Sequence, residues 1–137
     1  MKAIGIDIDK KRVICFAVEK DEKGKVTNIT GKLKFFEVKD DQDNSQLRQF
    51  VSTIQNYFDS VKPEAIAIQT RQTKGRFSAA PSSFKLEGLI QLYDKVDISF
   101  ISPQTIAAFY KKNDLKIQCD NKYQENALKL ANYLLNQ

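Results

Sequence analysis

The chain has 137 residues, which suits one compact domain, and we expect a single domain over residues 1–137. Hydrophobic residues make up 42% of the chain, but no apolar run reaches the roughly 20 residues that a membrane span needs. The sequence has no histidine, which excludes histidine-dependent triads and histidine zinc ligands, and its net charge of +5 slightly favours a polyanionic partner.

The N-terminus meets acid at Asp7 after only a short apolar run, so it lacks the long apolar region of a signal peptide. Two cysteines, Cys15 and Cys119, are too few for a disulfide framework. The absence of a membrane-length apolar run and of a signal peptide's apolar region predicts a soluble, cytoplasmic protein with no membrane partner.

Three extended segments open the chain. Residues 2–9 alternate, with isoleucines on one face and Gly5, Asp7 and Asp9 on the other. Residues 12–19, "RVICFAVE", are rich in β-branched and aromatic residues, and residues 26–39 continue as a third stretch with a bulge expected at Gly31. The short connections predict an antiparallel meander.

The hydrophobic period changes to that of a helix in residues 40–63. We expect Asp43 and Gln46 to form a capping box and Pro63 to end this helix. Residues 64–69, "EAIAIQ", then have the apolar character of a strand buried on both faces.

The rest of the chain alternates helices with one more strand. Ser83 is expected to cap the next helix, residues 97–101 form the last strand, and Ser102 caps a helix that has Pro103 in its first turn. A final helix has an apolar stripe of Ala127, Leu130, Ala131 and Leu134. Helical crossovers make the later strands parallel, which predicts an α/β fold with a mixed five-stranded sheet and helices on both faces. That order and size match the ribonuclease H-like fold.

Acidic side chains are the candidates for metal chemistry. In this fold the first strand pairs with the strand at residues 64–69, so Asp7 would lie beside Gln69 and Thr70 at the carboxyl ends of parallel strands. Two-metal phosphodiester hydrolysis needs several carboxylates, and without histidine the metal would be Mg²⁺ or Mn²⁺. The candidate metal ligands are Asp7, Asp9, Glu87 and Glu125, and the catalytic set would be Asp7, Glu87 and Glu125.

This carboxylate set is incomplete, because Gln69 and Thr70 are uncharged where a second acid is expected. Each candidate also has an ordinary structural explanation. The aspartates could be a solvated strand end, Glu87 an acid in the first turn of a helix, and Glu125 a surface partner of Lys129.

A basic loop follows the strand at residues 64–69. Its candidate phosphate- or nucleic-acid-binding residues are Arg71, Lys74, Gly75, Arg76 and Phe77, with Lys85 in the next helix. Phe77 could stack on a base. The alternative is an ordinary surface loop whose Phe77 packs into the core.

Two family resemblances follow from these motifs. The segments "GIDIDKKRVICFAV" and "ENALKLANYL" resemble Holliday-junction resolvases of the RuvC type. Such resolvases have acids on the first strand, the fourth strand and the last helix. Here Asp7 matches, Gln69 or Thr70 replaces the second acid, and Asn126 falls where a final-helix Asp might stand.

The second resemblance spans nearly the whole chain. Residues 74–106, from "KGRF" through "SFKLE" to the "SP" that begins a helix, are similar to a small bacterial family of unknown function, DUF3010, as are "LRQF" and "YQENA". This resemblance implies kinship without implying a reaction.

We therefore predict a domain that binds a phosphate-bearing partner, with nucleic acid as the leading candidate. Three alternatives stay open: a catalytically inactive protein-interaction module or homodimer, a weak Mg²⁺- or Mn²⁺-dependent nuclease, and a small-ligand pocket beneath the "KGRF" loop.

Overall fold

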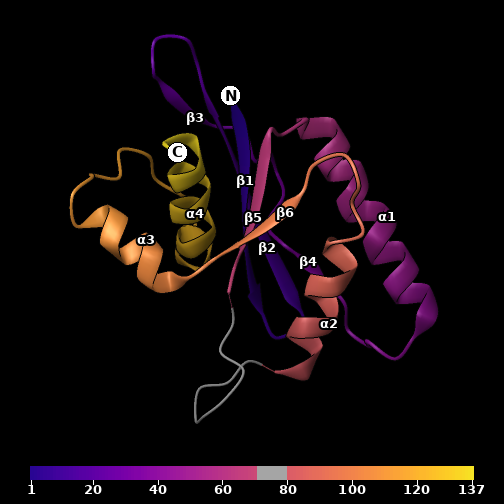
Figure 1. Ribbon diagram of the computed structural model, residues 1–137. Helices are drawn as coiled ribbons and strands as arrows, with labels where there is room; N and C mark the ends of the chain where they lie inside the picture. The colour runs from indigo at the N-terminus through magenta and orange to yellow at the C-terminus, as the bar shows by residue number, and fades with distance from the viewer. Residues whose placement is uncertain (71–79) are drawn as a thin grey trace.

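The computed structural model describes residues 1–70 and 80–137. Within these residues six strands form one sheet in the order β3-β2-β1-β5-β6, and the short β4 also pairs with β2 (Figure 1). The strands are β1 (Lys2–Asp9), β2 (Arg12–Lys20), β3 (Val26–Asn28), β4 (Phe36–Glu37), β5 (Ala65–Gln69) and β6 (Ile98–Ile101). The helices are α1 (Asn44–Val61), α2 (Pro81–Ile90), α3 (Pro103–Tyr110) and α4 (Glu125–Leu135), with a 3₁₀ turn, η1 (Lys122–Gln124), before α4.

The sheet is mixed, as the sequence predicts. β1 is antiparallel to β2 and parallel to β5, and β5 is parallel to β6. β1 and β5 are central and contribute residues buried on both faces, and β5 reads as a nearly continuous apolar run. This arrangement confirms the α/β class and the ribonuclease H-like architecture.

Two apolar layers cover the sheet, one on each face. Ile4, Ile6 and Ile8 pack on the side of α1 and α2, whereas Ala3 packs with α4 on the opposite side. Figure 1 shows α1 and α2 on one side of the sheet and α3 and α4 on the other. No helix in the described parts of the chain is long and apolar enough to cross a membrane.

The third extended stretch differs from its prediction. It is interrupted by a turn in which Gly31 has a φ of 79°, and only its ends, β3 and β4, pair with β2. Thr30 explains the interruption, because its hydroxyl accepts a hydrogen bond from the Ala17 N–H at 3.0 Å. The Thr30 side chain thereby takes the place of a backbone partner on a neighbouring strand. Gly31 lies in a turn and not in the bulge that the sequence predicts.

Helix starts agree with the sequence in part. Asp43 caps α1 by accepting from the Ser45 N–H at 2.9 Å, and Ser102 caps α3, as predicted. The capping box is wrong, because Gln46 Oε1 accepts from the Asp40 N–H instead. Ser83 does not cap α2, which begins earlier at Pro81, and its hydroxyl donates to the Lys10 carbonyl at 3.1 Å.

Candidate functional site

One edge of the sheet gathers the carboxyl ends of β1 and β5 together with the N-terminal ends of α2 and α4 (Figure 1). The tight turn between β1 and β2, which contains Lys10 and Lys11, lies at the same edge because Asp9 pairs with Arg12 across it. In open α/β sheets ligands bind at the carboxyl ends of the strands, and helix N-termini favour anions. This edge is therefore the candidate site.

Asp7 is the acid that the fold places most firmly here. It lies on the α4 face of β1, two residues after Gly5, and its side chain is 7% exposed. The α4 backbone approaches Gly5 so closely that a Cβ there would lie 2.2 Å from the Ala127 carbonyl oxygen. This approach brings the first turn of α4 next to Asp7, and Asn126 Nδ2 donates to Asp7 Oδ2 at 3.4 Å.

The other predicted acids are arranged differently. Glu125 forms an ion pair with Lys129 at 3.1 Å, and Asp9 forms one with Arg12 at 2.8 Å. Glu87 is buried on α2, which packs on the face of the sheet opposite α4. The residue of α4 that contacts Asp7 is thus the neutral Asn126, and the neighbouring acid Glu125 pairs with a cation.

Three of the four candidate ligands border one hollow. Asp7, Asp9 and Glu125 line a cavity of about 440 Å³ together with Lys122, Tyr123 and Asn126. Even so, no group of three or more Asp, Glu, His or Cys side chains in the described residues could hold a metal ion. Residues 71–79 contain none of these four residue types. The carboxylates of the described residues thus form no metal cluster of that size, and the roles of Asp7, Asp9, Glu87 and Glu125 as metal ligands stay predictions.

Arg12 is a site residue that the sequence reasoning missed. Its guanidinium lies 5.1 Å from the ring centroid of Phe35 and 5.8 Å from that of Tyr123. The two rings also meet edge to face, with centroids 5.8 Å apart. A planar cation held by two rings and one carboxylate has a fixed orientation. The sequence did contain one signal for this role of Arg12: Asp9 and Arg12 flank a two-residue turn between strands, which places an acid opposite a cation.

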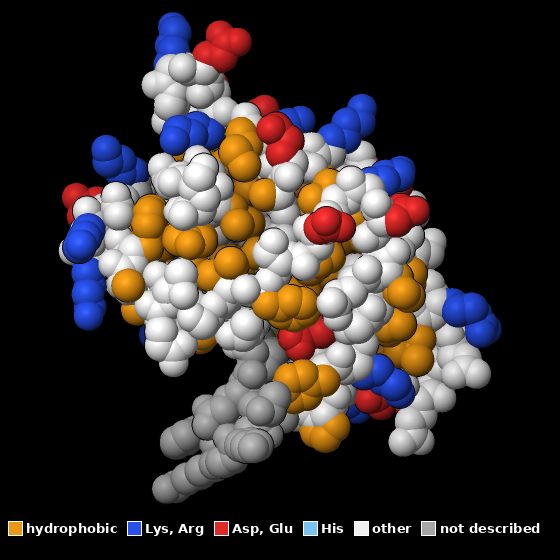
Figure 2. All heavy atoms as spheres, viewed as in Figure 1, with side chains coloured by type: hydrophobic (Ala, Val, Ile, Leu, Met, Phe, Trp, Pro, Cys, Tyr) orange, Lys and Arg blue, Asp and Glu red, His pale blue; other side chains and the backbone are white. Residues whose placement is uncertain are grey.

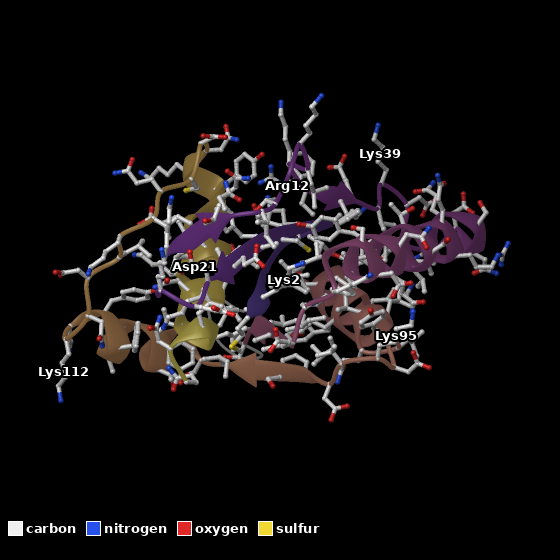
Figure 3. All side chains as sticks on the ribbon, turned by 90° about the horizontal axis from the view of Figure 1, so that it is seen from above. Lys2, Arg12, Asp21, Lys39, Lys95 and Lys112 are labelled. Atoms are coloured by element: carbon white, nitrogen blue, oxygen red, sulfur yellow. The ribbon has the colours of Figure 1, made fainter. Side chains whose placement is uncertain are left out.

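A second hollow of about 510 Å³ lies beside the β1–β2 turn. It is lined by Asp9, Lys10, Lys11 and Arg12 of that turn, with Glu37, Ala80 and Ser82. Lys11 Nζ donates to the Lys39 carbonyl at 3.0 Å, and Figure 3 shows Arg12 and Lys39 on the same side of the molecule. The turn thus places a ridge of three consecutive cations along this hollow, and its Asp9 lines both hollows.

The predicted phosphate-binding residues are only partly described. Arg71, Lys74, Gly75, Arg76 and Phe77 lie outside the described residues. Thr70 and Ala80, the residues that flank this stretch, lie at the end of β5 and the start of α2. Lys85 donates through Nζ to the Asp41 carbonyl, so it is engaged with the segment before α1.

The two cysteines offer no reactive thiol at this edge. Cys15 is fully buried in β2, and burial raises the pKa of its thiol well above the ordinary value. Burial also raises the pKa of Cys119.

Comparisons with solved structures show the same fold in resolvases. Thermus thermophilus RuvC superposes with a TM-score of 0.71 at 16% identity, covering 96% of this chain and 91% of that one. Its complex with a Holliday junction substrate gives the same TM-score at 15% identity, covering 96% and 90%. The fowlpox virus Holliday junction resolvase gives 0.53 at 14% identity, covering 99% and 98%. At these identities the likeness shows the fold alone.

No curated protein matches the sequence significantly. A family model described as "Protein of unknown function (DUF3010)" matches residues 1–134, nearly the whole chain. The chain therefore belongs to the DUF3010 family and has the ribonuclease H-like fold that RuvC shares.

Proposed function

We propose that the edge formed by the β1–β2 turn and the first turns of α2 and α4 binds nucleic acid through its phosphates. The observation that carries the proposal is the ridge of Lys10, Lys11 and Arg12, all three of which line one hollow at this edge. Consecutive phosphates of a nucleic-acid strand are regularly spaced anions, so a cationic ridge along a concave surface suits them.

Two helix N-termini support the same partner, because the backbone N–H groups of α2 and α4 begin at this edge. In the sequence, residues 71–79 contain Arg71, Lys74 and Arg76 and no acid. Recognition that depends on cations and helix ends needs no resident metal.

The comparison with RuvC supports this choice of partner over others. The T. thermophilus structure with a Holliday junction substrate has the same fold over 96% of this chain. The proposal for this chain is binding of nucleic acid. The test has two competing outcomes: cleavage with Mg²⁺ or Mn²⁺, and a protein-interaction or homodimer role without nucleic acid.

The test measures binding of fluorescently labelled linear duplex and four-way-junction DNA by anisotropy over a series of salt concentrations. The double variant Lys10→Gln/Lys11→Gln removes two cations of the ridge. We expect weaker binding and a salt dependence whose logarithmic slope falls by about 2, roughly one for each phosphate that a lysine no longer neutralises.

The matched control is Lys23→Gln/Lys25→Gln. These lysines lie in the turn after β2, at the opposite end of that strand, about 26 Å from Arg12 by strand length. This control changes net charge equally and should leave the slope unchanged. The proposal is wrong if the wild-type protein does not bind DNA at low salt, or if both double variants lose the same affinity.

A parallel incubation with Mn²⁺ tests the nuclease alternative. Cleavage of the same DNA that disappears in Asp7→Asn would show a working metal site. Binding without cleavage supports the proposal as stated.

A further inference from the structure

A third hollow lies far from the proposed nucleic-acid edge. Its volume is about 340 Å³, and it is formed by the β2–β3 hairpin, the end of α3 with the segment that follows it, and the C-terminal end of α4. Lys20 lines it at one end of β2, whereas Arg12 lies at the other end of that strand. The two sites are thus about 26 Å apart along β2.

The lining of this hollow is rich in hydrogen-bond donors. Three lysines, one from β2 and two from the segment after α3, line it with three asparagines and a single acid, Asp114, which leaves an excess of two positive charges. We call it the lysine–asparagine pocket, and these donors are Lys20, Lys112, Lys116, Asn113, Asn132 and Asn136. Figure 2 shows Lys and Arg side chains grouped at the left, over α3 and the segment after it.

Some of these donors are held in place from the core. Tyr110 donates to the Lys129 carbonyl at 2.7 Å and accepts from Asn132 Nδ2 at 3.0 Å. Asn136 Nδ2 donates to the Asn132 carbonyl at 2.7 Å, and Lys20 Nζ donates to Asn136 Oδ1 at 3.3 Å. Asn132 is buried on the otherwise apolar face of α4, so a polar residue interrupts the core where the core meets this pocket. A connected, satisfied network of this kind orients the groups at its end.

More lysines line the pocket than the C-terminal end of α3 needs to offset its helix dipole. A cation near the last carbonyls of α3 offsets the helix dipole, and Lys111 and Lys112 follow that helix directly. Lys20 comes from β2 and Lys116 from four residues beyond Lys112, so neither belongs to the last turn of α3. Figure 3 shows Lys112 extending outward from the molecule, on a flexible four-carbon stem.

One wall of the pocket is aromatic. Phe109 lines it and is fixed by edge-to-face contacts with Tyr110 and Tyr133, at centroid distances of 4.9 and 5.2 Å. Gly24 lines the opposite side with φ 84° and open space where a Cβ would be. A volume near the lower end of ligand pockets, about 300 Å³ and upward, suits a small ligand with one charged group.

We propose that the lysine–asparagine pocket binds a small phosphate monoester that carries a flat ring, of the size of a mononucleotide. The lysines hold the phosphate, because ammonium donors satisfy its oxygens, and the Phe109 wall contacts the ring. This site is independent of nucleic-acid binding at the β1–β2 edge.

The test uses adenosine 5′-monophosphate as the probe, with thermal unfolding and isothermal titration as readouts. Inorganic phosphate and adenosine are the two part-ligands. We expect saturable binding of the monophosphate, weaker binding of inorganic phosphate and still weaker binding of adenosine. Equal affinity for adenosine and the monophosphate would overturn the phosphate contact, and equal affinity for inorganic phosphate would overturn the ring contact.

Two exposed lysines give a variant that should fold normally. Lys112→Gln/Lys116→Gln should weaken monophosphate binding by at least about tenfold, the equivalent of one charge-assisted hydrogen bond. Lys32→Gln/Lys34→Gln, two exposed lysines between β3 and β4 that line neither this pocket nor the hollows of the nucleic-acid edge, is the control and should bind the monophosphate as the wild type does. Unchanged affinity in the pocket variant, equal losses in both variants, or no binding by the wild type at millimolar probe would each overturn the proposal. DNA binding should be unaffected by the pocket variant, so failure here is distinct from failure of the nucleic-acid site.

Discussion

Gly5 of β1 and Ala127 of α4 are in such close contact that a Cβ on Gly5 would lie 2.2 Å from the Ala127 carbonyl oxygen. The same Cβ would lie 2.6 Å from the Ala131 backbone nitrogen. Neither atom can move away by a change of rotamer, because both belong to the helix backbone. This contact sets the depth at which α4 packs on the sheet, and it brings Asn126 to Asp7.

Gly5→Ala should therefore displace α4 and destabilise the protein. We expect the free energy of unfolding, measured by urea titration, to fall by about 3 kcal/mol, the upper end of overpacking costs in cores. Gly88→Ala is the matched control. Gly88 lies inside α2 with nothing within 4 Å of the added Cβ, so that change should raise stability by up to about 1 kcal/mol. Equal stability of the two variants would contradict the close packing of β1 on α4.

The sheet was predictable because two periodic signals agree. Alternating isoleucines in residues 2–9 and the apolar run at residues 64–69 both indicate central strands, and the crossover rule makes them parallel neighbours. The structure pairs Ile6 with Ile68, as that rule requires. Nothing in the sequence indicates that Gly5 is a contact with a helix more than 100 residues later, since a glycine in a strand has several explanations.

The details of the site were less predictable, for a geometric reason. Successive residues of a helix point about 100° apart, so shifting the contact by one residue replaces Glu125 with Asn126 beside Asp7. The sequence places both residues at the start of α4 but does not give the rotation of the helix. The role of Arg12 likewise depends on Phe35 and Tyr123, which are distant in the sequence and meet only in the fold.

Asn126→Asp tests whether the wild-type Asp7 carboxylate is held by a neutral hydrogen-bond donor, Asn126, and not by a metal ion. A second carboxylate beside Asp7 raises the pKa of the pair, because two like charges at this distance oppose ionisation. The folded variant then holds a proton more tightly than the unfolded chain, so its stability should fall as pH rises through that raised pKa. Thermal unfolding at neutral and mildly acidic pH measures the loss, and Mn²⁺ should restore stability by binding both carboxylates.

The wild-type protein should show no saturable stabilisation by Mn²⁺, because its carboxylates do not form a metal cluster in the described residues. Gln104→Glu, on the exposed side of α3 and with no acid three or four residues away, is the control for a new carboxylate and should not respond to Mn²⁺. A saturable rise in the unfolding temperature of the wild type would instead support the metal roles predicted for Asp7, Asp9, Glu87 and Glu125.

Asp9→Asn should raise the affinity for DNA. Asp9 pairs with Arg12 at 2.8 Å, and both side chains are partly exposed, so the pair adds little stability, about 1 kcal/mol at most. Without the carboxylate, Arg12 is available to a phosphate and the edge is more positive. We expect several-fold tighter binding at low salt, measured by anisotropy, and a smaller gain at high salt. Glu22→Gln, in the turn after β2, changes charge equally and should have no effect. Weaker binding by Asp9→Asn would show that the carboxylate itself contacts the ligand.

Tyr93→Phe should alter the acid dependence of stability. Hydrogen bonds from Lys95 at 2.9 Å and from the Tyr93 hydroxyl at 2.8 Å lower the pKa of Asp59 below its ordinary value of 3.8. A lowered folded-state pKa contributes stability above pH 3.8, and this stability is lost as pH falls through the folded pKa. The variant should be less stable than the wild type at neutral pH, and the difference should narrow in acid.

At alkaline pH the stability difference between Tyr93→Phe and the wild type narrows as pH rises, whereas in acid it narrows as pH falls. Burial and the bond to Asp59 raise the pKa of Tyr93 to about 12 from 10.0, so its contribution is complete below pH 10 and is lost as pH approaches 12. Tyr57→Phe is the control, because the Tyr57 hydroxyl donates to the Thr30 carbonyl, which does not titrate. Its cost of about 1 kcal/mol should be the same at neutral and acidic pH. Urea titrations across pH distinguish Tyr93→Phe from the Tyr57→Phe control. A loss of stability in Tyr93→Phe that is the same at neutral and acidic pH would show that Asp59 is held by Lys95 alone.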